Sequence, residues 1–219
     1  MIKNIIFDFD GVLVDSEILV AKAFAKYMQN FGIDIDEKEF ASFAGKKTVQ
    51  VIDILSKKYS IKDQEKFFTD IMEIASNIYK KELTTVKGAY DFVSNLKLNM
   101  FIGSNSMKER ILDGLQRVKL DKYFKPEQVY SFDLVDNPKP DPDVYLKALE
   151  DNNLIKTETI IIEDSAVGVM AGVAANVKVI GLTAGGHWHE KRDEKELLEA
   201  GAFAVTNDYK KVFKLIESN

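Results

Sequence analysis

The sequence predicts an α/β fold in which a doubly wound parallel sheet carries an inserted all-helical block. Over most of the chain, short apolar runs rich in β-branched residues alternate with segments whose apolar residues recur every three or four positions. This alternation indicates βαβ units and a parallel sheet that helices cover on both faces. It is interrupted between residues 16 and 82, where the apolar spacing is helical throughout.

Several short runs are candidate strands of this sheet. The clearer ones are residues 2–7, 99–106, 158–164 and 177–184, and the weaker ones are residues 128–132 and 202–207. Between them, apolar residues at helical spacing predict helices over residues 89–96, 108–118, 143–152 and 209–216.

Residues 16–83 are predicted to form a helical cap that is inserted directly after the first strand. Three amphipathic segments, residues 16–32, 47–60 and 62–83, follow one another there without a convincing strand between them. The predicted core domain is therefore residues 1–15 together with residues 84–219. The two linkers are expected near Asp15 and at residues 84–87.

The composition excludes several kinds of chemistry. The chain of 219 residues has no cysteine, so disulfides, thiolate nucleophiles and sulfur-bound metals are excluded and a reducing compartment fits. The net charge of -5 argues against nonspecific binding to nucleic acid or to an anionic membrane. No apolar stretch is long enough to span a bilayer, and the acids at positions 8 and 10 interrupt the N-terminal apolar run. We therefore expect a cytoplasmic protein, monomeric by default.

Polar residues collect at the ends of three predicted strands. These residues are Asp8 and Asp10, then the Ser-Asn-Ser stretch at 104–106, and finally Glu163 and Asp164. In open α/β sheets, ligands bind beyond the carboxyl ends of the strands. One acidic pair is readily explained as a helix cap, but three polar strand ends in one sheet are harder to explain by capping alone.

Asp8, Asp10 and Asp164 are predicted to converge on a divalent cation. The two-residue spacing of Asp8 and Asp10 directs both side chains to one face of an extended chain, and Gly11 lets the backbone approach their ligand. Three carboxylates would repel one another without a cation such as Mg²⁺, which prefers carboxylate, phosphate and water oxygens. The alternative is that these acids only cap the segments that follow them, Asp164 the helix expected over residues 165–176.

Lys139 lies on a stiff loop, because Pro138 and Pro140 restrict the backbone on both sides of it. Asp141 is the expected N-cap of the helix that follows, with Pro142 at its first helical position. A lysine held near a rim of acids is expected to neutralise charge on a substrate phosphate, on a nucleophilic carboxylate or on both. The alternative is a solvated lysine in a surface loop.

Residues 103–106, Gly-Ser-Asn-Ser, join a predicted strand to the next predicted helix. Ser104, the Asn105 N–H and Ser106 offer hydrogen-bond donors at a helix N-terminus, where anions are favoured. Serine at a helix start usually serves as a cap, so the signal is weak by itself. Beside Lys139 and the acids, it predicts the third wall of a phosphate pocket.

Four stretches, DFDGVLVDS, GSNS, KPDPD and IIEDS, follow one another in that order between positions 8 and 165. Together they resemble the four motifs of the haloacid dehalogenase-like (HAD) hydrolase superfamily. The helical insertion after the first motif resembles the cap of the β-phosphoglucomutase-like and sugar-phosphatase branch. The resemblance covers nearly the whole chain and implies a Rossmann-like core.

The resemblance implies a role for each acidic motif residue. Asp8 would be the nucleophile that forms an aspartyl-phosphate, and Asp10 would serve as general acid and then as general base. Mg²⁺ would be held by the Asp8 carboxylate, the Asp10 backbone carbonyl and Asp164, with Glu163 supporting it through water.

The same resemblance places Ser104 and Lys139 on the transferring phosphoryl oxygens, and Lys139 would also keep Asp8 ionised. Phosphoryl transfer depends on in-line positioning and charge neutralisation, which this set of residues offers. Asp10 argues against the dehalogenase reaction, because that reaction does not use the second aspartate of the first motif as an acid.

The cap is expected to select the substrate. In phosphoglucomutase-like members, a cap loop carries an arginine that clamps the second phosphate of the sugar, whereas residues 45–48 here are Gly-Lys-Lys-Thr. Lysine cannot bind a phosphate in the bidentate manner of arginine. In addition, Met107 stands where the mutases carry a further lysine. Lys46 is predicted to contact an anionic part of the substrate, the alternative being a solvated helix start. The predicted phosphate- and substrate-binding residues are Gly11, Ser104, Asn105, Lys139 and Lys46.

We therefore predict a Mg²⁺-dependent phosphatase of small phosphorylated metabolites, with sugar phosphates or phosphorylated sugar acids as substrates. A phosphosugar mutase is the alternative enzyme. A non-catalytic phospho-acceptor module that resembles a response-regulator receiver would also use a strand-end aspartate, Mg²⁺ and a lysine. The helical block, the length of the chain and Asp10 argue against that module.

Two further features have simpler interpretations. His187 and His189 flank Trp188 in a glycine-rich loop, and a zinc site there lacks an evident third ligand, so we expect a surface or rim loop. Gly168 and Gly172 are expected to let their helix pack closely against the sheet or a neighbouring helix.

Overall fold

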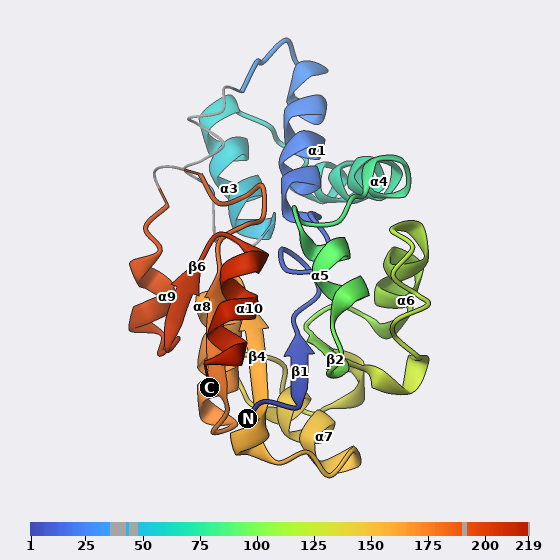
Figure 1. The fold of residues 1–219 in the computed structure, drawn as a ribbon. Helices are drawn as coiled ribbons and strands as arrows, with labels where there is room; N and C mark the ends of the chain where they lie inside the picture. The colour runs from blue at the N-terminus through green and yellow to red at the C-terminus, as the bar shows by residue number, and fades with distance from the viewer. Residues whose placement is uncertain (36–42, 44–47, 190–191, 219) are drawn as a thin grey trace. The chain divides into compact units, whose positions relative to one another are not determined.

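The computed structural model describes residues 1–35, 43, 48–189 and 192–218, and Figure 1 shows its ribbon. The chain divides into two compact units. The first comprises Met1–Asp15, Thr84–Trp188 and Asp193–Asn219, and the second comprises Ser16–Leu83 and His189–Arg192. Among the described residues, all strands belong to the first unit, and the regular elements of the second unit are helices.

The first unit contains a six-stranded parallel sheet with the order β3-β2-β1-β4-β5-β6. The strands are β1 (Asn4–Phe7), β2 (Asn99–Ser104), β3 (Val129–Ser131), β4 (Thr159–Glu163), β5 (Lys178–Leu182) and β6 (Ala204–Thr206). Each strand lies within a run of residues that the sequence predicts to be extended. The predicted α/β class with a parallel sheet is confirmed.

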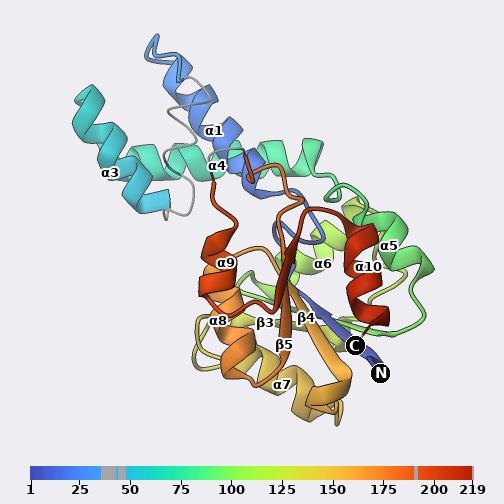
Figure 2. The same ribbon diagram turned by 60° about the vertical axis from the view of Figure 1, so that its left-hand side comes forward.

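Helices cover both faces of this sheet. They are α5 (Ala89–Asn95), α6 (Lys108–Arg117), α7 (Asp143–Asp151), α8 (Ala166–Ala174), α9 (Lys195–Glu199) and α10 (Tyr209–Glu217). Figure 2 shows α7 and α8 on one side of the sheet and α5 and α10 on the other. The doubly wound arrangement is therefore as predicted.

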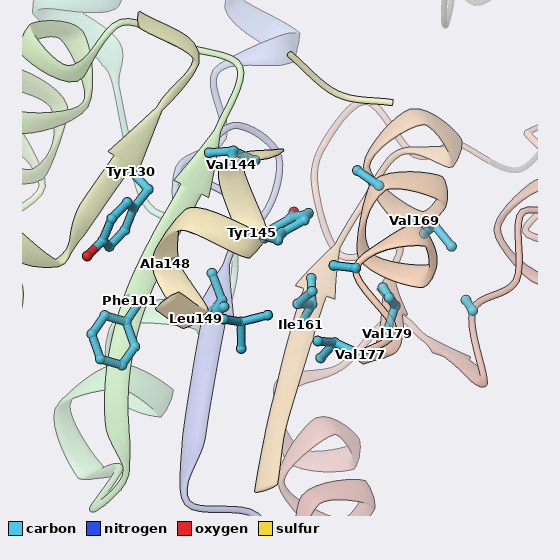
Figure 3. Close-up of a cluster of buried hydrophobic side chains, with 14 of the residues drawn as sticks. Phe101, Tyr130, Val144, Tyr145, Ala148, Leu149, Ile161, Val169, Val177 and Val179 are labelled. Carbon is cyan, nitrogen blue, oxygen red and sulfur yellow. The ribbon is translucent and has the colours of Figure 1, made fainter. Parts of the chain in front are cut away.

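Consecutive residues of the central strand β1 face opposite helical layers. Ile6 belongs to a buried apolar cluster with Tyr145 of α7, part of which Figure 3 shows between α7, β4 and α8. Phe7 meets Phe92 of α5 and Phe124 edge to face, at centroid distances of 6.1 and 6.0 Å. Each fully buried Ile or Phe contributes roughly 1.5–3 kcal/mol of hydrophobic stabilisation. The strand that leads to the acidic motif is thus fixed from both sides.

Gly172 allows α8 to lie close to the sheet. A Cβ at this position would lie 2.6 Å from Val179 Cγ2 and 3.1 Å from Ile161 Cδ1, so a larger residue would collide with β5 and β4. The close packing expected of this helix is confirmed at Gly172.

The second unit has its own apolar core among its described residues. Its helices are α1 (Glu17–Gln29), α3 (Thr48–Tyr59) and α4 (Gln64–Glu82), one within each predicted helical segment. Tyr27 of α1 stacks on Phe67 of α4 with ring centroids 4.4 Å apart, and Leu55 of α3 is buried in the same cluster. At the start of α4, the Asp63 carboxylate accepts a hydrogen bond from the Lys66 N–H and caps the helix.

The predicted N-cap of α7 is wrong by one residue. The helix begins at Asp143 with Pro142 as N-cap, whereas the sequence predicts Asp141 as N-cap. The Asp141 N–H donates to Pro138 O and closes a turn, and the Asp143 carboxylate accepts hydrogen bonds from Asn137. Asp141 thus belongs to the turn that presents Lys139.

No helix among the described residues is both long enough and apolar enough to cross a bilayer.

Candidate active site

Three neighbouring strands bring the predicted motif residues to one edge of the sheet. β1 pairs with β2 and β4, and Phe7 lies level with Ile102 on one side and with Ile162 on the other. Asp8 follows β1 directly, and its N–H donates to Ile162 O at 2.9 Å. Because parallel strands end at the same edge, the last residues of β2 and β4, Ser104 and Glu163, lie beside Asp8.

Asp8, Glu163 and Asp164 form a buried acidic cluster. One carboxylate oxygen from each residue lies within 4.8 Å of the others. The side chains of Asp8 and Asp164 are 11% and 6% exposed, and that of Glu163 is fully buried. Glu163 thus stands where the sequence interpretation placed the Asp10 side chain, and it joins the cluster directly.

Lys139 is the cationic centre of this cluster, so the alternative of a solvated loop lysine is wrong. Its Nζ donates to Asp8 Oδ1 at 2.7 Å, to Glu163 Oε1 at 2.6 Å and to Gly103 O at 2.8 Å. The side chain of Asn105 holds the Lys139 backbone on both sides, because Oδ1 accepts from the Lys139 N–H and Nδ2 donates to the Lys139 carbonyl. The structure therefore gives Asn105 a contact with the lysine loop that sequence reasoning missed.

The charges in the cluster do not balance, since three carboxyl groups face one ammonium group. Burial raises the pKa of Asp8 well above its usual range, repulsion from Glu163 and Asp164 adds to the rise, and Lys139 opposes it. Burial disfavours the Lys139 ammonium, but attraction to Asp8 and Glu163 outweighs it, so the pKa of Lys139 is raised. The excess of acid therefore contributes to both shifts, beside the burial of Asp8, and a further positive charge would relieve the repulsion.

Glu163 is held by Tyr145 of α7 and by Ser165, the N-cap of α8. Tyr145 O–H donates to Glu163 Oε1 at 2.6 Å, and Ser165 O–H donates to Oε2 at 3.1 Å. A Cβ at Gly168 would lie 1.8 Å from Glu163 Oε1, so glycine is required there for space. Burial, together with the neighbouring Glu163, raises the pKa of Tyr145 well above its usual value. Sequence reasoning missed Tyr145, since its helical spacing indicates only a core residue.

The Asp10 side chain contacts Ser106 of the second motif and Arg110 of α6. Its Oδ2 accepts a hydrogen bond from Ser106 Oγ at 2.5 Å and pairs with Arg110 Nη1 at 2.7 Å. The Asp10 side chain is 16% exposed and that of Arg110 is 39% exposed. Sequence reasoning missed Arg110, because its partner Asp10 lies 100 residues away in the chain.

The Ser-Asn-Ser stretch lies before the helix rather than at its first turn. α6 begins at Lys108 with Met107 as N-cap. The prediction that Ser104 to Ser106 offer donors at the helix N-terminus is therefore wrong, because these residues precede the helix. Ser104 is buried, and its Oγ accepts a hydrogen bond from the Ser106 N–H at 3.0 Å. Ser104 nevertheless ends β2 next to Gly103, whose carbonyl accepts a hydrogen bond from Lys139 Nζ.

Asp164 does not cap α8, so that alternative is wrong. Ser165 is the N-cap, and its Oγ accepts a hydrogen bond from the Gly168 N–H at 3.1 Å. Asp164 Oδ2 lies 2.9 Å from His187 Nε2. His187 follows β5 in the loop whose function sequence reasoning left open.

The buried cluster is suited to bind a hard divalent cation, because each of its three acidic residues offers a carboxylate oxygen. Gly11 has φ of +76°, and a Cβ there would lie 1.8 Å from Asp164 Oδ2, so the backbone passes close to the acids as predicted. The remaining predicted residue, Lys46, lies outside the described residues.

Comparisons with known proteins agree with this geometry. A phosphorylated carbohydrates phosphatase of Thermotoga maritima is 32% identical over 208 residues, which cover 93% of each chain. A 6-phosphogluconate phosphatase of Escherichia coli is 29% identical over 189 residues, which cover 85% of each chain. Both matches extend over most of the chain.

Solved structures of similar proteins share the fold of this chain over nearly its whole length. A haloacid dehalogenase-like protein of unknown function from Agrobacterium tumefaciens superposes with a TM-score of 0.88 at 28% identity, covering 100% of this chain and 99% of the other. A putative β-phosphoglucomutase from Thermotoga maritima superposes with a TM-score of 0.81 at 29% identity, covering 99% of both.

The match to the family itself spans residues 5–182, which include the first, second, third and fourth motif stretches. The predicted enzyme class agrees with the phosphatases among the relatives. With the acidic cluster and its lysine at the carboxyl ends of a parallel sheet, the chain belongs to the haloacid dehalogenase-like hydrolase family, close to its β-phosphoglucomutase-like and sugar-phosphatase members.

Proposed function

We propose that the chain is a Mg²⁺-dependent phosphatase of small phosphorylated metabolites that works through an aspartyl-phosphate. The observation that carries the proposal is the buried contact between Lys139 Nζ and Asp8 Oδ1, inside a cluster of two further acids. A carboxylate that is buried, partnered by one lysine and short of positive charge is suited to receive a phosphoryl group together with a cation.

In the first step, an Asp8 carboxylate oxygen attacks phosphorus, and the bond between phosphorus and the ester oxygen breaks. The leaving oxygen takes a proton from the Asp10 carboxylic acid, which becomes a carboxylate. Lys139 favours the ionised form of Asp8 that attacks, and Ser104 and Lys139 are assigned to the phosphoryl oxygens.

In the second step, water attacks the phosphorus of the aspartyl-phosphate, and the Asp10 carboxylate takes a proton from that water. The acyl–phosphate bond breaks, inorganic phosphate leaves, and Asp8 is restored as a carboxylate. Arg110 and Ser106 stabilise the Asp10 carboxylate, which is the form this step requires.

Mg²⁺ supplies positive charge to the phosphoryl oxygens and to the acidic cluster when bound. The Asp8 carboxylate, the Asp10 backbone carbonyl and Asp164 would hold it, with Glu163 in support. The excess of acid over base in the cluster and its all-oxygen ligands support this assignment.

The substrate class is proposed as sugar phosphates or phosphorylated sugar acids. Two relatives that span most of the chain act, by their names, on phosphorylated carbohydrates and on 6-phosphogluconate. A phosphosugar mutase is the second candidate, favoured by the structural similarity to a putative β-phosphoglucomutase. Met107 and the lysines at positions 46 and 47 argue for the phosphatase.

A phosphate-release assay over a panel of phosphorylated metabolites tests the proposal. We expect Mg²⁺-dependent release, fastest with a sugar phosphate or a phosphorylated sugar acid. No turnover of any substrate or of p-nitrophenyl phosphate with any divalent cation would overturn it. Conversion of β-glucose 1-phosphate to glucose 6-phosphate in the presence of a bisphosphate primer would identify a mutase instead.

The covalent intermediate can be tested separately. After mixing with a ³²P-labelled substrate and quenching in acid, we expect label on the protein that hydroxylamine removes, as for an acyl phosphate. The label should be absent in D8N. Label that persists in D8N would assign the nucleophile to another residue.

A further inference from the structure

His187 makes a directed contact with a residue of the acidic cluster. Its Nε2 lies 2.9 Å from Asp164 Oδ2, and the two side chains are 14% and 6% exposed. A carboxylate oxygen is an acceptor, so the imidazole donates through Nε2–H. The contact joins the loop after β5 to the end of β4, 23 residues apart in the sequence.

The backbone leaves just enough room for this imidazole. A Cβ at Gly185 would lie 2.8 Å from both Cε1 and Nδ1 of His187, and a Cβ at Gly11 would lie 2.9 Å from His187 Cε1. The same Cβ at Gly11 would lie 1.8 Å from Asp164 Oδ2. Two glycines from different loops therefore border the histidine and its carboxylate partner.

The loop is anchored independently of Asp164. The Gly186 N–H donates to Asp15 Oδ1 at 2.9 Å, and the Trp188 N–H closes a turn onto Gly185 O at 3.0 Å. Trp188 packs against the buried apolar cluster that contains Ile6 and Tyr145. Since these contacts fix the residues on either side of His187, the imidazole is placed before any ligand arrives.

We propose that His187 is a positioning residue that orients the Asp164 carboxylate toward the divalent cation. The inference rests on the proposed function, because it requires a cation at the Asp8, Glu163 and Asp164 cluster. A hydrogen bond to one carboxylate oxygen fixes the rotation of the group and directs the other oxygen to the metal. Such partners of metal ligands typically change metal affinity by about 10–100-fold when they are removed.

Direct cation binding tests the proposal without relying on turnover. Mg²⁺ is titrated by calorimetry, and Mn²⁺ by electron paramagnetic resonance, into the wild type and the variants H187L, H187Q and D164N. We expect H187L to weaken binding about 10–100-fold. H187Q, which keeps a donor, should recover most of the affinity, and D164N should lose most of it.

A matched control and a steady-state measurement complete the design. H189L changes the same residue type two positions along and should leave cation affinity within twofold of the wild type. In turnover, H187L should raise the Mg²⁺ concentration for half-maximal rate by the same factor while kcat at saturating Mg²⁺ stays close to that of the wild type. Thermal unfolding of each variant reports whether it is folded, and H187Q remains informative if H187L is not.

The outcomes separate this inference from the proposed function. Wild-type affinity in folded H187L or equal losses in H187L and H187Q would overturn the positioning role alone. A wild type that binds no divalent cation at all would overturn the proposed function as well.

Discussion

Arg110 Nη1 lies 2.7 Å from Asp10 Oδ2, and Ser106 Oγ contacts both groups. The carboxylate proposed as acid and base is therefore held by a helix that the second motif introduces, and not by the acidic cluster beside it. Asp8 and Asp10 are two residues apart, yet one contacts a buried ammonium and the other a partly exposed guanidinium. This difference in environment fits the different roles proposed for the two aspartates and suggests several experiments.

The first prediction concerns Arg110. We expect R110M to lower kcat about tenfold, part of the hundredfold or more that general acid–base catalysis contributes, with less than a threefold change in KM. R110K should have an intermediate kcat, because an ammonium keeps the charge but not the planar hydrogen-bonding geometry of the guanidinium. R117Q is the control, since Arg117 lies on the same helix and pairs with Asp113. A raised KM with unchanged kcat would show instead that Arg110 binds the substrate.

The second prediction concerns the buried lysine. K139M should abolish hydrolysis and lower the free energy of unfolding by about 3–5 kcal/mol, because it leaves Asp8 and Glu163 buried without their ammonium partner. K147M removes an exposed pair with Asp151 and should cost about 0.5 kcal/mol. Urea unfolding measures both. A similar loss in the two variants would contradict the central position of Lys139.

The third prediction separates activity from stability at the nucleophile. D8N should lose essentially all hydrolysis, yet its melting temperature should equal or exceed that of the wild type. The reason is that burial disfavours the Asp8 carboxylate and Glu163 and Asp164 repel it, whereas an amide has no charge to desolvate or repel. D121N, an exposed position, controls for the substitution itself. A clear drop in melting temperature for D8N alone would mean that the pair with Lys139 outweighs the repulsion.

The fourth prediction concerns the cation. Mg²⁺ should raise the melting temperature of the wild type, because a ligand at 100 times its Kd adds about 2.7 kcal/mol to the folded state. EDTA should remove both this gain and the phosphatase activity. NaCl at matched ionic strength is the control for screening, and D164N should show little gain. Equal stabilisation by NaCl and Mg²⁺ would argue against a specific site.

The fifth prediction is a pH dependence. Tyr209 O–H donates to Val12 O at 2.8 Å, and burial, with Asp164 and Asp8 adding to it, raises the pKa of Tyr209 well above its usual value of 10.0. The unfolded chain therefore loses the phenol proton first, so the contribution of Tyr209 is complete below about pH 10 and falls as the pH rises further.

Urea unfolding at pH 8 and at pH 11 measures this effect. At pH 8, Y209F should be about 1 kcal/mol less stable than the wild type, which is the usual contribution of a hydrogen bond. At pH 11 the difference should shrink, because phenylalanine has no proton to lose. A difference that grows with pH would contradict the sign of the shift.

Much of the fold follows from local patterns in the sequence. Each of the six strands lies within a predicted run, because short β-branched segments between helices have few alternatives to a buried parallel sheet. The N-cap of α7 is predicted one residue too early, because Asp141 and Pro142 fit a helix start but the Asp141 N–H donates to Pro138 O in a turn. Local residue preferences cannot decide between a cap and a turn that serves a site.

The candidate site was predicted in its composition and only partly in its contacts. Acids at strand ends and a lysine between prolines are visible in the sequence because the spacing itself carries the chemistry. Arg110, Tyr145 and His187 carry no such local signal, since an arginine or tyrosine at helical spacing also suits a solvated or buried helix face. Their partners lie 100, 18 and 23 residues away.

By itself the sequence determined the class of the protein: a parallel α/β sheet with an inserted helical block, and an aspartate-based site that also contains a lysine. These properties depend on residue order and on strand and helix periods, which are visible in short stretches of the sequence. Only the tertiary structure decided which carboxylate meets which partner. Glu163 joined the acidic cluster while Asp10 turned to Arg110, because the direction of each side chain depends on the neighbouring strand ends and helices and not on its spacing along the chain.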